Sequence, residues 1–327
     1  MDLEQRLEKR VVFFNRELKN FFKNGSPKTL YDAARYLPLA GGKRLRPSLS
    51  VLSCEAVNGE VGKVVPFAVA VELIHNFTLV HDDIMDKSKL RRNLSAVHVR
   101  YGEPTAIMAG DFLFAKAFEA MQNIPVNPSV FKELDFGFVK CVEEICEGQQ
   151  LDMEFEKRRN VTEKEYLGMI SKKTASLFRY SAEGGAVIGG GTRDEVKALK
   201  KYGESLGLAF QIHDDYLDMS SDEKILGKDI GNDIRNGKKT LIAVHSLNKA
   251  TGKDKEVLEE IFGNENASEE DVRSVFKLFN EIKSVEYAEK TALEYSNEAK
   301  KAINILESTD AKEVLIDLAD YSVSREK

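Results

Sequence analysis

Two stretches of the chain are apolar on almost every helical face, and both end in a cluster of aspartates. They are FAVAVELIHNFTLVHDDIM (67–85) and SLGLAFQIHDDYL (205–217). A helix on a protein surface keeps a polar face over several turns. We therefore expect these two helices to be largely buried, with their carboxylates at one end. The strict alternation that marks a half-buried strand is missing, so the pattern predicts helices throughout.

Helix boundaries follow from capping and breaking residues. Ser26-Pro27 places a capping residue before a proline at the first helical position. Three pairs fit the capping box: Thr162 with Glu165, Thr192 with Glu195 and, as a weaker version, Ser268 with Asp271. All seven prolines lie in the first 128 residues, so the remainder permits long helices. These signals predict helices over 2–23, 27–37, 45–58, 63–86, 104–123, 127–158, 163–188, 193–220, 237–249, 254–263, 269–279, 282–306 and 311–323.

No stretch has the composition of a linker between domains. Gly189–Gly191 is the best candidate, but it is short and flanked by helical patterns. The sequence therefore predicts an all-α fold in one domain over residues 1–327.

Composition narrows the class of protein. The net charge is −6, whereas nucleic-acid binders usually carry a basic excess. Three cysteines without CxxC spacing argue against a disulfide framework and a zinc site. The first ten residues, MDLEQRLEKR, are charged where a signal peptide needs an apolar run. We find no apolar stretch of membrane-spanning length, so we expect a cytoplasmic protein without a membrane span.

The two aspartate clusters have the spacing of a metal site. Asp82 and Asp86 are four residues apart, so they lie on one face of a helix, and Asp214 and Asp218 repeat the arrangement. Two carboxylates this close repel each other unless a cation lies between them. Mg²⁺ is typically held by one or two carboxylates together with substrate phosphates. A solvated acidic face is the alternative, but the apolar surroundings of both clusters favour a shared metal site.

A metal held by acidic residues implies an anionic ligand, and the chain supplies cations for one. The basic groups are Gly41-Gly42-Lys43-Arg44-Leu45-Arg46, Lys87–Arg92, Lys172-Lys173-Thr174 and the lysines of GKDIGNDIRNGKKT (227–240). Each group alone is more often a solvated charge run. Because both aspartate clusters are followed by such a group, metals and cations together are expected to hold phosphate groups.

These motifs resemble the polyprenyl diphosphate synthase family, in the order which that family uses. They are GGKRLRP (41–47), DDIMD with RR (82–92), GDFLFAKAF (110–118), GQQLD (148–152), KKTA (172–175), FQIHDDYLD (210–218) and GKDIGNDIRNGKKT (227–240). The resemblance implies a multi-helix bundle around a deep central cavity, the isoprenoid synthase fold, and a homodimer. It also implies a transferase that condenses isopentenyl diphosphate with an allylic diphosphate (dimethylallyl, geranyl or farnesyl).

The resemblance assigns roles residue by residue. Asp82, Asp86, Asp214 and Asp218 would hold three Mg²⁺ ions. The allylic diphosphate would be contacted by Arg91, Lys173, Thr174, Gln211, Lys228 and Lys238. Isopentenyl diphosphate would be held by Lys43, Arg46, His75 and Arg92. One departure is Asn93, where the family commonly has glycine; asparagine tolerates left-handed backbone, so the loop is still expected to turn.

Product length remains open between C15 and C20. Phe77 lies five residues before Asp82, about 7.5 Å lower along a helix. A large aromatic ring there would act as a floor under the growing chain, although ordinary core packing is the simpler interpretation. Two other functions compete, a class I terpene cyclase and a non-catalytic regulatory subunit of a heteromeric synthase. The DDYLD motif (214–218) and the basic GGKRLRP turn argue against the cyclase, and the completeness of both aspartate motifs argues against the regulatory subunit.

Overall fold

The computed structural model describes residues 3–22, 25–220 and 229–325; of Glu4, 218–220 and 229–232 only the backbone is described. Lys228 therefore lies outside the described residues, as does the side chain of Asp218.

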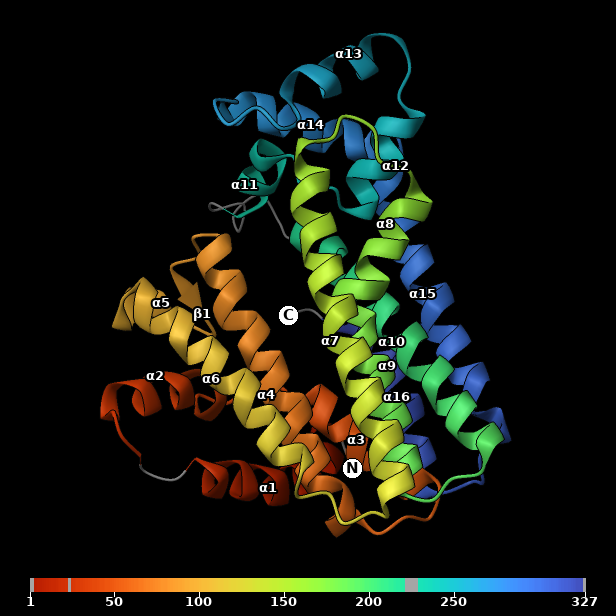
Figure 1. The fold of residues 1–327 in the computed structure, drawn as a ribbon. Coiled ribbons are helices and arrows are strands. Elements are labelled where there is room, and N and C mark those ends of the chain that lie inside the picture. Colours follow the sequence, from red (N-terminus) through yellow and green to blue (C-terminus); the bar gives the residue numbers. More distant parts are fainter. Residues whose placement is uncertain (1–2, 23–24, 221–228, 326–327) are drawn as a thin grey trace. The chain divides into compact units, whose positions relative to one another are not determined.

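The regular secondary structure of the described part of the chain is helical apart from one two-stranded hairpin (Figure 1). Its elements are α1 (Leu3–Phe21), α2 (Lys28–Leu39), α3 (Leu45–Ala56), α4 (Val61–Met85), β1 (Leu90–Arg91), β2 (Leu94–Ser95), α5 (Val97–Tyr101), α6 (Glu103–Met121), α7 (Pro128–Lys157), α8 (Glu163–Ile170), the π-helical segment η1 (Ser171–Ala175), α9 (Ser176–Ile188), α10 (Arg193–Ser220), α11 (Asp229–Asn236), α12 (Leu241–Lys249), α13 (Gly252–Ile261), α14 (Glu269–Glu281), α15 (Ser284–Ala302), the 3₁₀ segment η2 (Ile303–Ile305) and α16 (Asp310–Ser324).

The predicted all-α fold is confirmed, and most predicted helices end within a few residues of the observed ones. Three features were not predicted: the hairpin β1–β2, the short helix α5, and helix α11. The stretch 163–188, predicted as one regular helix, is interrupted by η1. All three predicted capping boxes form, with Glu165, Glu195 and Asp271 each accepting from the backbone N–H of its capping residue.

The chain divides into two compact units. Unit 1 consists of residues 1–139, 180–200 and 303–315, and unit 2 of residues 140–179, 201–302 and 316–327. Helices α7, α9, α10 and α16 each contribute residues to both. The single domain expected from the sequence stays a prediction.

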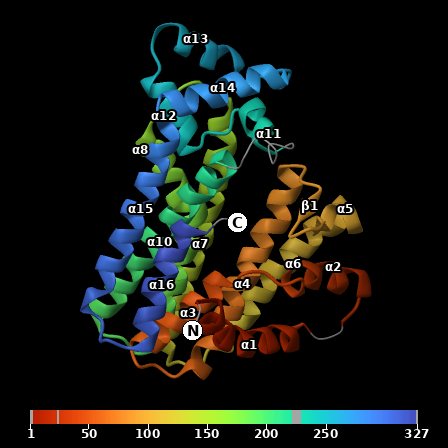
Figure 2. The same ribbon diagram turned by 180° about the vertical axis from the view of Figure 1, so that it is seen from behind.

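Unit 1 is built around α3 and α4. Nearly every residue of α3 is buried, and so is every residue of α4 from Val64 to Ile74 except the half-buried Pro66. Helix α4 packs along α6, and the two lie side by side in both views (Figures 1 and 2). The expectation that the first aspartate-bearing helix is largely buried is therefore confirmed.

Helix α4 is also the one helix among the described residues that is long and apolar enough to cross a membrane. No segment of membrane-spanning length was expected from the sequence. Within the protein, 67% of its most apolar 18-residue window is buried, which is the setting of an ordinary core helix. Length and hydropathy alone therefore do not make α4 a membrane span.

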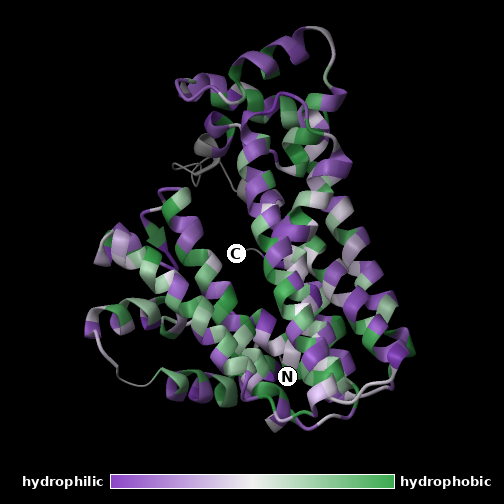
Figure 3. Cartoon of the chain, in the orientation of Figure 1, coloured by the Kyte–Doolittle hydropathy of each residue, from purple (hydrophilic) through white to green (hydrophobic). Residues whose placement is uncertain are grey.

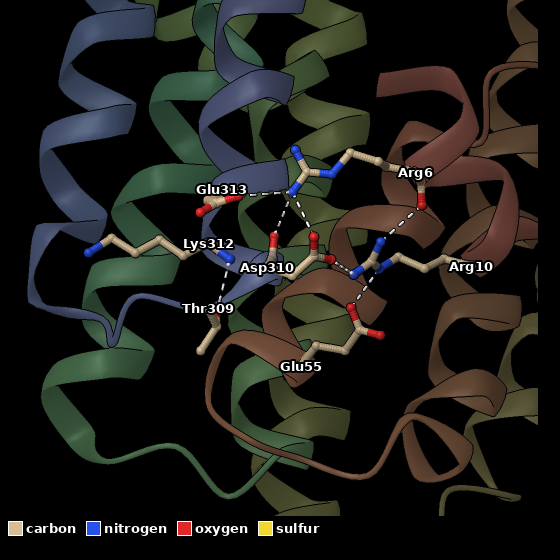
Figure 4. A network of polar contacts seen from close by, with 7 residues as sticks. All are labelled: Arg6, Arg10, Glu55, Thr309, Asp310, Lys312 and Glu313. Atoms are coloured by element: carbon tan, nitrogen blue, oxygen red, sulfur yellow. Dashed lines mark hydrogen bonds and ion pairs between the residues drawn. The ribbon is translucent and has the colours of Figure 1, made fainter. Parts of the chain in front are cut away.

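Charged contacts join three parts of unit 1 that are far apart in the sequence (Figure 4). Arg6 in α1 donates to the Asp310 carboxylate at 2.8 Å, and Arg10 donates both to Asp310 at 2.9 Å and to Glu55 of α3 at 2.5 Å. Because Asp310 is the first residue of α16, these contacts connect the start of that helix with α1 and α3. Pairs with one exposed partner contribute little energy each, so they specify position more than stability.

Unit 2 has its own apolar core. Its largest fully buried members include Tyr166 and Phe279, packed with residues of α10, α12 and α14 such as Ile212, Leu241 and Val275. Helices α10 and α15 are joined by Lys201 and Glu298, whose charged atoms are 3.6 Å apart. Hydrophobic and hydrophilic residues alternate around most helices (Figure 3), as amphipathic packing requires.

Candidate active site

The first aspartate motif forms the C-terminal end of α4. Asp82 is partly exposed, and Asp86 is exposed at the position that caps the helix. The backbone N–H of Asp86 donates to the Asp82 carbonyl at 2.8 Å, so the two residues are one turn apart. Asp83, between them, is fully buried. The outer two aspartates therefore lie on the accessible side of the helix end, as predicted, and the middle one does not.

Asp83 has a partner of its own, Arg91. The guanidinium Nε donates to Asp83 Oδ1 at 2.9 Å, and Nη2 donates to the same oxygen at 2.5 Å. A buried carboxylate requires such a partner. The pair fixes the direction of Arg91, which was predicted to contact the allylic diphosphate and whose side chain remains 34% exposed.

Arg92 and Asn93 form the two-residue turn of the hairpin that carries Arg91. Both have positive φ, 53° and 60°, as a type I′ hairpin turn requires. Asn93 therefore adopts the left-handed backbone that the sequence analysis expected. The Arg92 side chain donates to the carbonyls of Gly41 and Leu37, the latter at 3.3 Å.

The basic turn 41–46 depends on its glycines. Gly41 and Gly42 have φ of 98° and 129°, and a Cβ on Gly42 would lie 2.9 Å from Cζ of Arg92. Arg44, which caps α3, is buried and pairs with the buried Glu72 of α4. Arg44 is thus a structural residue, while its neighbour Lys43 is exposed.

Of the residues predicted to hold isopentenyl diphosphate, Arg46 and His75 lie close together in unit 1, and the charge of Arg92 acts on His75. Arg46 Nη1 and His75 Nε2 are 3.4 Å apart. Burial, followed by the positive charges of Arg46 and Arg92, lowers the pKa of His75 well below its usual value. The imidazole is therefore neutral at pH 7 in a cluster of cations, a setting that attracts an anion.

The second aspartate motif lies within α10, in unit 2. Asp214 is partly exposed and accepts from Arg325 Nη2, whose guanidinium also lies 3.8 Å from the centroid of the Phe210 ring. Asp215 is buried and accepts from the Tyr166 hydroxyl at 2.7 Å and from Gln211 Nε2 at 3.1 Å. As in the first motif, the middle aspartate has protein partners.

Lys172, Lys173 and Thr174 lie in η1. Single turns of π-helix are rare and occur often at functional sites. A Cβ on Gly148 would lie 2.2 Å from the backbone nitrogen of Lys173, so α7 approaches this segment as closely as glycine allows. Lys173 Nζ lies 2.5 Å from the Asp152 carboxylate, and Thr174 Oγ1 donates to Gln211 Oε1 at 2.8 Å. Three predicted diphosphate ligands of unit 2, Lys173, Thr174 and Gln211, are thereby fixed by neighbours.

Lys238 and Lys239 follow α11. Lys238 Nζ lies 3.4 Å from Asp233 Oδ2, and it is half-buried. Lys239 is buried, donates to the Gly237 carbonyl at 2.8 Å and lies over the Phe262 ring; burial lowers the pKa of its ammonium to about 8. Lys239 is therefore part of the packing, and Lys238 is the more accessible of the two lysines.

Phe77 belongs to a continuous row of aromatic rings in unit 1. Its ring lies 4.9 Å from that of His81 and 5.4 Å from that of Phe114. The row continues through Phe118, Phe138, Tyr180 and Phe67, with centroids 5.0 to 5.9 Å apart. The residue predicted as the floor is thus part of an aromatic row and packs against rings from α4 and α6.

The carboxylates suit a hard metal ion that shares its ligands with a substrate. Among the described side chains, no three of the types His, Cys, Asp and Glu gather to form a metal site within the protein alone. The outer aspartates that the structure describes, Asp82, Asp86 and Asp214, are at least partly exposed, whereas the middle aspartates Asp83 and Asp215 are buried and paired within the protein. Mg²⁺, which takes one or two carboxylates plus phosphates and waters, fits such a donor set.

Several residues of the site escaped the sequence analysis: Asp83, Asp152, Tyr166, Asp215 and Arg325. Asp152 ends the GQQLD motif, so the sequence indicated that this residue matters but not which residue it contacts. Asp83 and Asp215 were visible as members of the motifs. Nothing in the sequence marked Tyr166 or Arg325, because each meets the second motif only through the fold.

The described residues are almost entirely helical, and the two aspartate motifs are each accompanied by basic side chains; these are the features of a prenyl-transferring enzyme of the isoprenoid synthase fold. The comparisons agree. Residues 27–279 match the polyprenyl synthetase family model. A short chain isoprenyl diphosphate synthase of Methanothermobacter thermautotrophicus is 46% identical over 100% of this chain and 99% of its own. A geranylgeranyl diphosphate synthase of Methanosarcina mazei is 45% identical, covering 92% and 91%.

Among solved structures, the geranylgeranyl pyrophosphate synthetase of Pyrococcus horikoshii superposes with a TM-score of 0.93 at 43% identity, covering 99% of this chain and 98% of its own. The chain therefore belongs to the polyprenyl synthetase family. The predicted family, fold and transferase class are confirmed.

Proposed function

We propose that the chain condenses isopentenyl diphosphate with allylic diphosphates (dimethylallyl, geranyl or farnesyl) in a Mg²⁺-dependent reaction that gives a short-chain product. The observation that carries this proposal is the cluster of Arg46, His75 and Arg92 next to the Asp83–Arg91 pair in unit 1. A terpene cyclase handles one diphosphate, whereas this cluster supplies a second set of cations in addition to those of η1.

In this proposal Lys43, Arg46, His75 and Arg92 bind isopentenyl diphosphate. Arg91, Lys173, Thr174, Gln211, Lys228 and Lys238 bind the allylic diphosphate. Fixed cations act most strongly where charge develops during the reaction. Here that charge develops on the diphosphate as its bond to the allylic carbon breaks.

Asp82, Asp86, Asp214 and Asp218 would hold three Mg²⁺ ions. When bound, these ions neutralise charge on the departing diphosphate. The double bond of isopentenyl diphosphate then attacks the allylic cation, and the departing diphosphate takes the proton that the product loses. The chain needs no nucleophile of its own, and its part is to bind, orient and exclude water.

Phe77 would limit the length of the product to C20 or C15. Its support is the aromatic row, in which the Phe77 ring packs against Phe114 and Phe114 in turn packs against Phe118. A ring supported in this way does not yield easily to a growing prenyl chain. The relatives named above, two of them geranylgeranyl diphosphate synthases, favour C20.

A homodimer in the cytoplasm, with each chain acting as one domain, completes the proposal. Apolar side chains of unit 1 are exposed where a second copy could cover them: Val99 by 51%, Ile107 by 42%, Met108 by 54% and Phe136 by 66%. Large exposed apolar side chains mark interaction surfaces when they gather in a patch. Sedimentation of the purified chain tests this directly, and a monomer at micromolar concentration would contradict it.

Product analysis tests the reaction. The purified chain is incubated with Mg²⁺, labelled isopentenyl diphosphate and each allylic primer separately, and the dephosphorylated products are sized by chromatography. We expect extension that disappears with EDTA, with C20 as the longest major product. A cyclic hydrocarbon without isopentenyl incorporation would favour the cyclase. No turnover with any primer would favour a regulatory subunit.

A further inference from the structure

Four side chains of unit 2 form one continuous line of hydrogen bonds behind the second aspartate motif. The Tyr166 hydroxyl donates to Asp215 Oδ2 at 2.7 Å, and Gln211 Nε2 donates to Asp215 Oδ1 at 3.1 Å. Thr174 Oγ1 donates to Gln211 Oε1 at 2.8 Å. The line connects α8, α10 and η1, so it joins a core tyrosine to two proposed substrate ligands.

Most of this line is shielded from solvent. Tyr166 is 1% exposed, Asp215 4% and Thr174 8%. Burial, together with the charge of Asp215, raises the pKa of the Tyr166 hydroxyl well above its usual value, so this group keeps its proton and remains a donor. Hydrogen bonds in such surroundings are strong, and leaving one of their groups unpaired is costly.

Asp215 determines which groups donate and which accept along this line of hydrogen bonds, since both of its carboxylate oxygens accept. Gln211 must present its NH₂ group to Asp215, which leaves its amide oxygen for Thr174. The Thr174 hydroxyl hydrogen is then committed to Gln211. If the Gln211 amide were reversed, its oxygen would face a carboxylate oxygen. The orientation of both proposed ligands is therefore set by two buried residues, Tyr166 and Asp215.

We propose that Tyr166 and Asp215 are positioning residues that fix the Gln211 amide and the Thr174 hydroxyl for the transfer reaction, and that Asp215 is not a metal ligand. This inference rests on the proposed function. It separates the second motif into aspartates that face the metal and one that faces the protein. Tyr166 acts only through Asp215, so its effect should appear in turnover and not in the requirement for Mg²⁺.

The test is Tyr166→Phe, which removes one hydroxyl without changing charge or core volume. The matched control is Tyr202→Phe, another fully buried tyrosine of unit 2, on α10. We expect Y166F to lower kcat about tenfold, which corresponds to about 1.4 kcal/mol of barrier. The KM for isopentenyl diphosphate and the half-saturating Mg²⁺ concentration should stay within about twofold of wild type. Y202F should change the melting temperature alone.

A double-mutant cycle with Thr174→Val shows whether Tyr166 acts along the line. If it does, Y166F should lower kcat by less than about twofold once the Thr174 hydroxyl is absent, because residues of one network are not additive. Y202F should remain additive with T174V. Equal effects of Y166F in both backgrounds would overturn the proposal.

The same measurements separate this proposal from the function on which it rests. A wild-type chain that elongates no primer contradicts the function. An active wild type, with a Y166F variant that differs only in melting temperature, contradicts the positioning role alone. A raised Mg²⁺ requirement in Y166F would instead show that Asp215 belongs to the metal site.

Discussion

The two aspartate motifs, HDDIMD (81–86) and HDDYLD (213–218), have nearly the same sequence but different structural surroundings. The first ends its helix, and its middle aspartate pairs with Arg91 in the hairpin just beyond. The second lies inside α10, and its aspartates meet Tyr166 and Arg325, which are distant in sequence. In both motifs the first aspartate is partly exposed and the middle one is buried, while the supporting contacts are local in one motif and long-range in the other.

The histidines of the two motifs differ in the same way. His81 Nε2 lies 3.1 Å from the Ile107 carbonyl, and a Cβ on Gly110 would lie 2.1 Å from that nitrogen, so His81 sets how closely α6 approaches α4. His213 is buried and donates from Nε2 to the Arg325 carbonyl at 3.0 Å. Five residues before the first aspartate stands Phe77 in one motif and the buried Ala209 in the other. A bulky ring at this position therefore occurs only in the first motif.

The largest effects are expected where the two motifs are alike. Asp82→Ala and Asp214→Ala each remove a proposed metal ligand, and loss of one such electrostatic group typically costs about 10²–10³-fold in turnover. Turnover against Mg²⁺ concentration checks both, with Asp254→Ala on α13 as a control that should behave as wild type. Normal turnover of either variant at low Mg²⁺ would remove that residue from the metal site.

A smaller loss is expected where the motifs differ. Asp83→Asn keeps the shape of the side chain but removes the charge that holds Arg91, so the KM for the allylic diphosphate should rise about tenfold, the effect of losing about 1.4 kcal/mol of binding. Asp215→Asn should lower kcat instead, because it disturbs Gln211 and Thr174. Initial rates over a range of allylic diphosphate separate the two outcomes. If both variants changed the same constant, the middle aspartates would not have the distinct roles inferred here.

Phe77→Ala should lengthen the product by at least one C5 unit, because the first motif alone has a ring at this position. Phe279→Ala, in the core of unit 2, is the control; it should cost about 3–5 kcal/mol of stability without changing product length. Chromatographic sizing and thermal melting measure the two effects. An unchanged product distribution in F77A would make Phe77 ordinary core.

The fold and the accessible half of the site could be predicted because both depend on local patterns. Capping pairs, proline positions and apolar stretches specify where helices begin and end. The i, i+4 spacing of the aspartates indicates a metal site without knowledge of where the helix packs, and that site stays a prediction. The π-helical turn at 171–175 could not be predicted, since it requires the close approach of Gly148 from another helix. Tyr166 and Arg325 could not be assigned for the same reason, because a single sequence does not show contacts across 49 or 111 residues.

The hairpin was missed for a different reason. A type I′ turn favours Asn-Gly, but here it is formed by Arg92 and Asn93. Arginine rarely adopts a positive φ. The contacts of its side chain with the carbonyls of Leu37 and Gly41 hold it there. These contacts depend on the glycine turn, which lies about 50 residues earlier in the chain.

The histidines predict how stability depends on pH. His75 and His213 both have a lowered pKa in the folded protein, in each case chiefly through burial. As the pH falls below about 6.5, the unfolded chain takes up protons that the folded chain does not, so the unfolding free energy falls, by at most about 1.4 kcal/mol per pH unit for each group. This stability is fully present above that pH and is lost toward the folded pKa.

The unfolding free energy should depend on pH more steeply through His75, whose neighbours are cations, than through His213. The hydrogen bond of His213 to the Arg325 carbonyl opposes the lowering of its pKa. Urea midpoints at pH 7.5 and 5.5 measure it. His75→Asn should flatten the dependence more than His213→Asn. Equal slopes in wild type and H75N would show that His75 protonates as easily in the folded chain as in the unfolded one.

The smallest effect concerns Arg325, whose side chain is 5% exposed and pairs with Asp214. A metal ion that binds Oδ1 of Asp214 would compete with this guanidinium for the oxygen. Because Asp214 itself is 39% exposed, the pair contributes about 1 kcal/mol at most. Arg325→Ala should therefore tighten Mg²⁺ binding by no more than about fivefold, and Arg325→Lys should tighten it less.

Arg91→Ala should not tighten Mg²⁺ binding at all, since Arg91 pairs with the middle aspartate of its motif and not with an outer one. Calorimetric titration with Mg²⁺ in the absence of substrate distinguishes these cases. Weaker binding in R325A would mean that Arg325 orients Asp214 for the metal instead of competing with it, and the second motif would then depend on the C-terminal end of the chain for its metal site as well as for its packing.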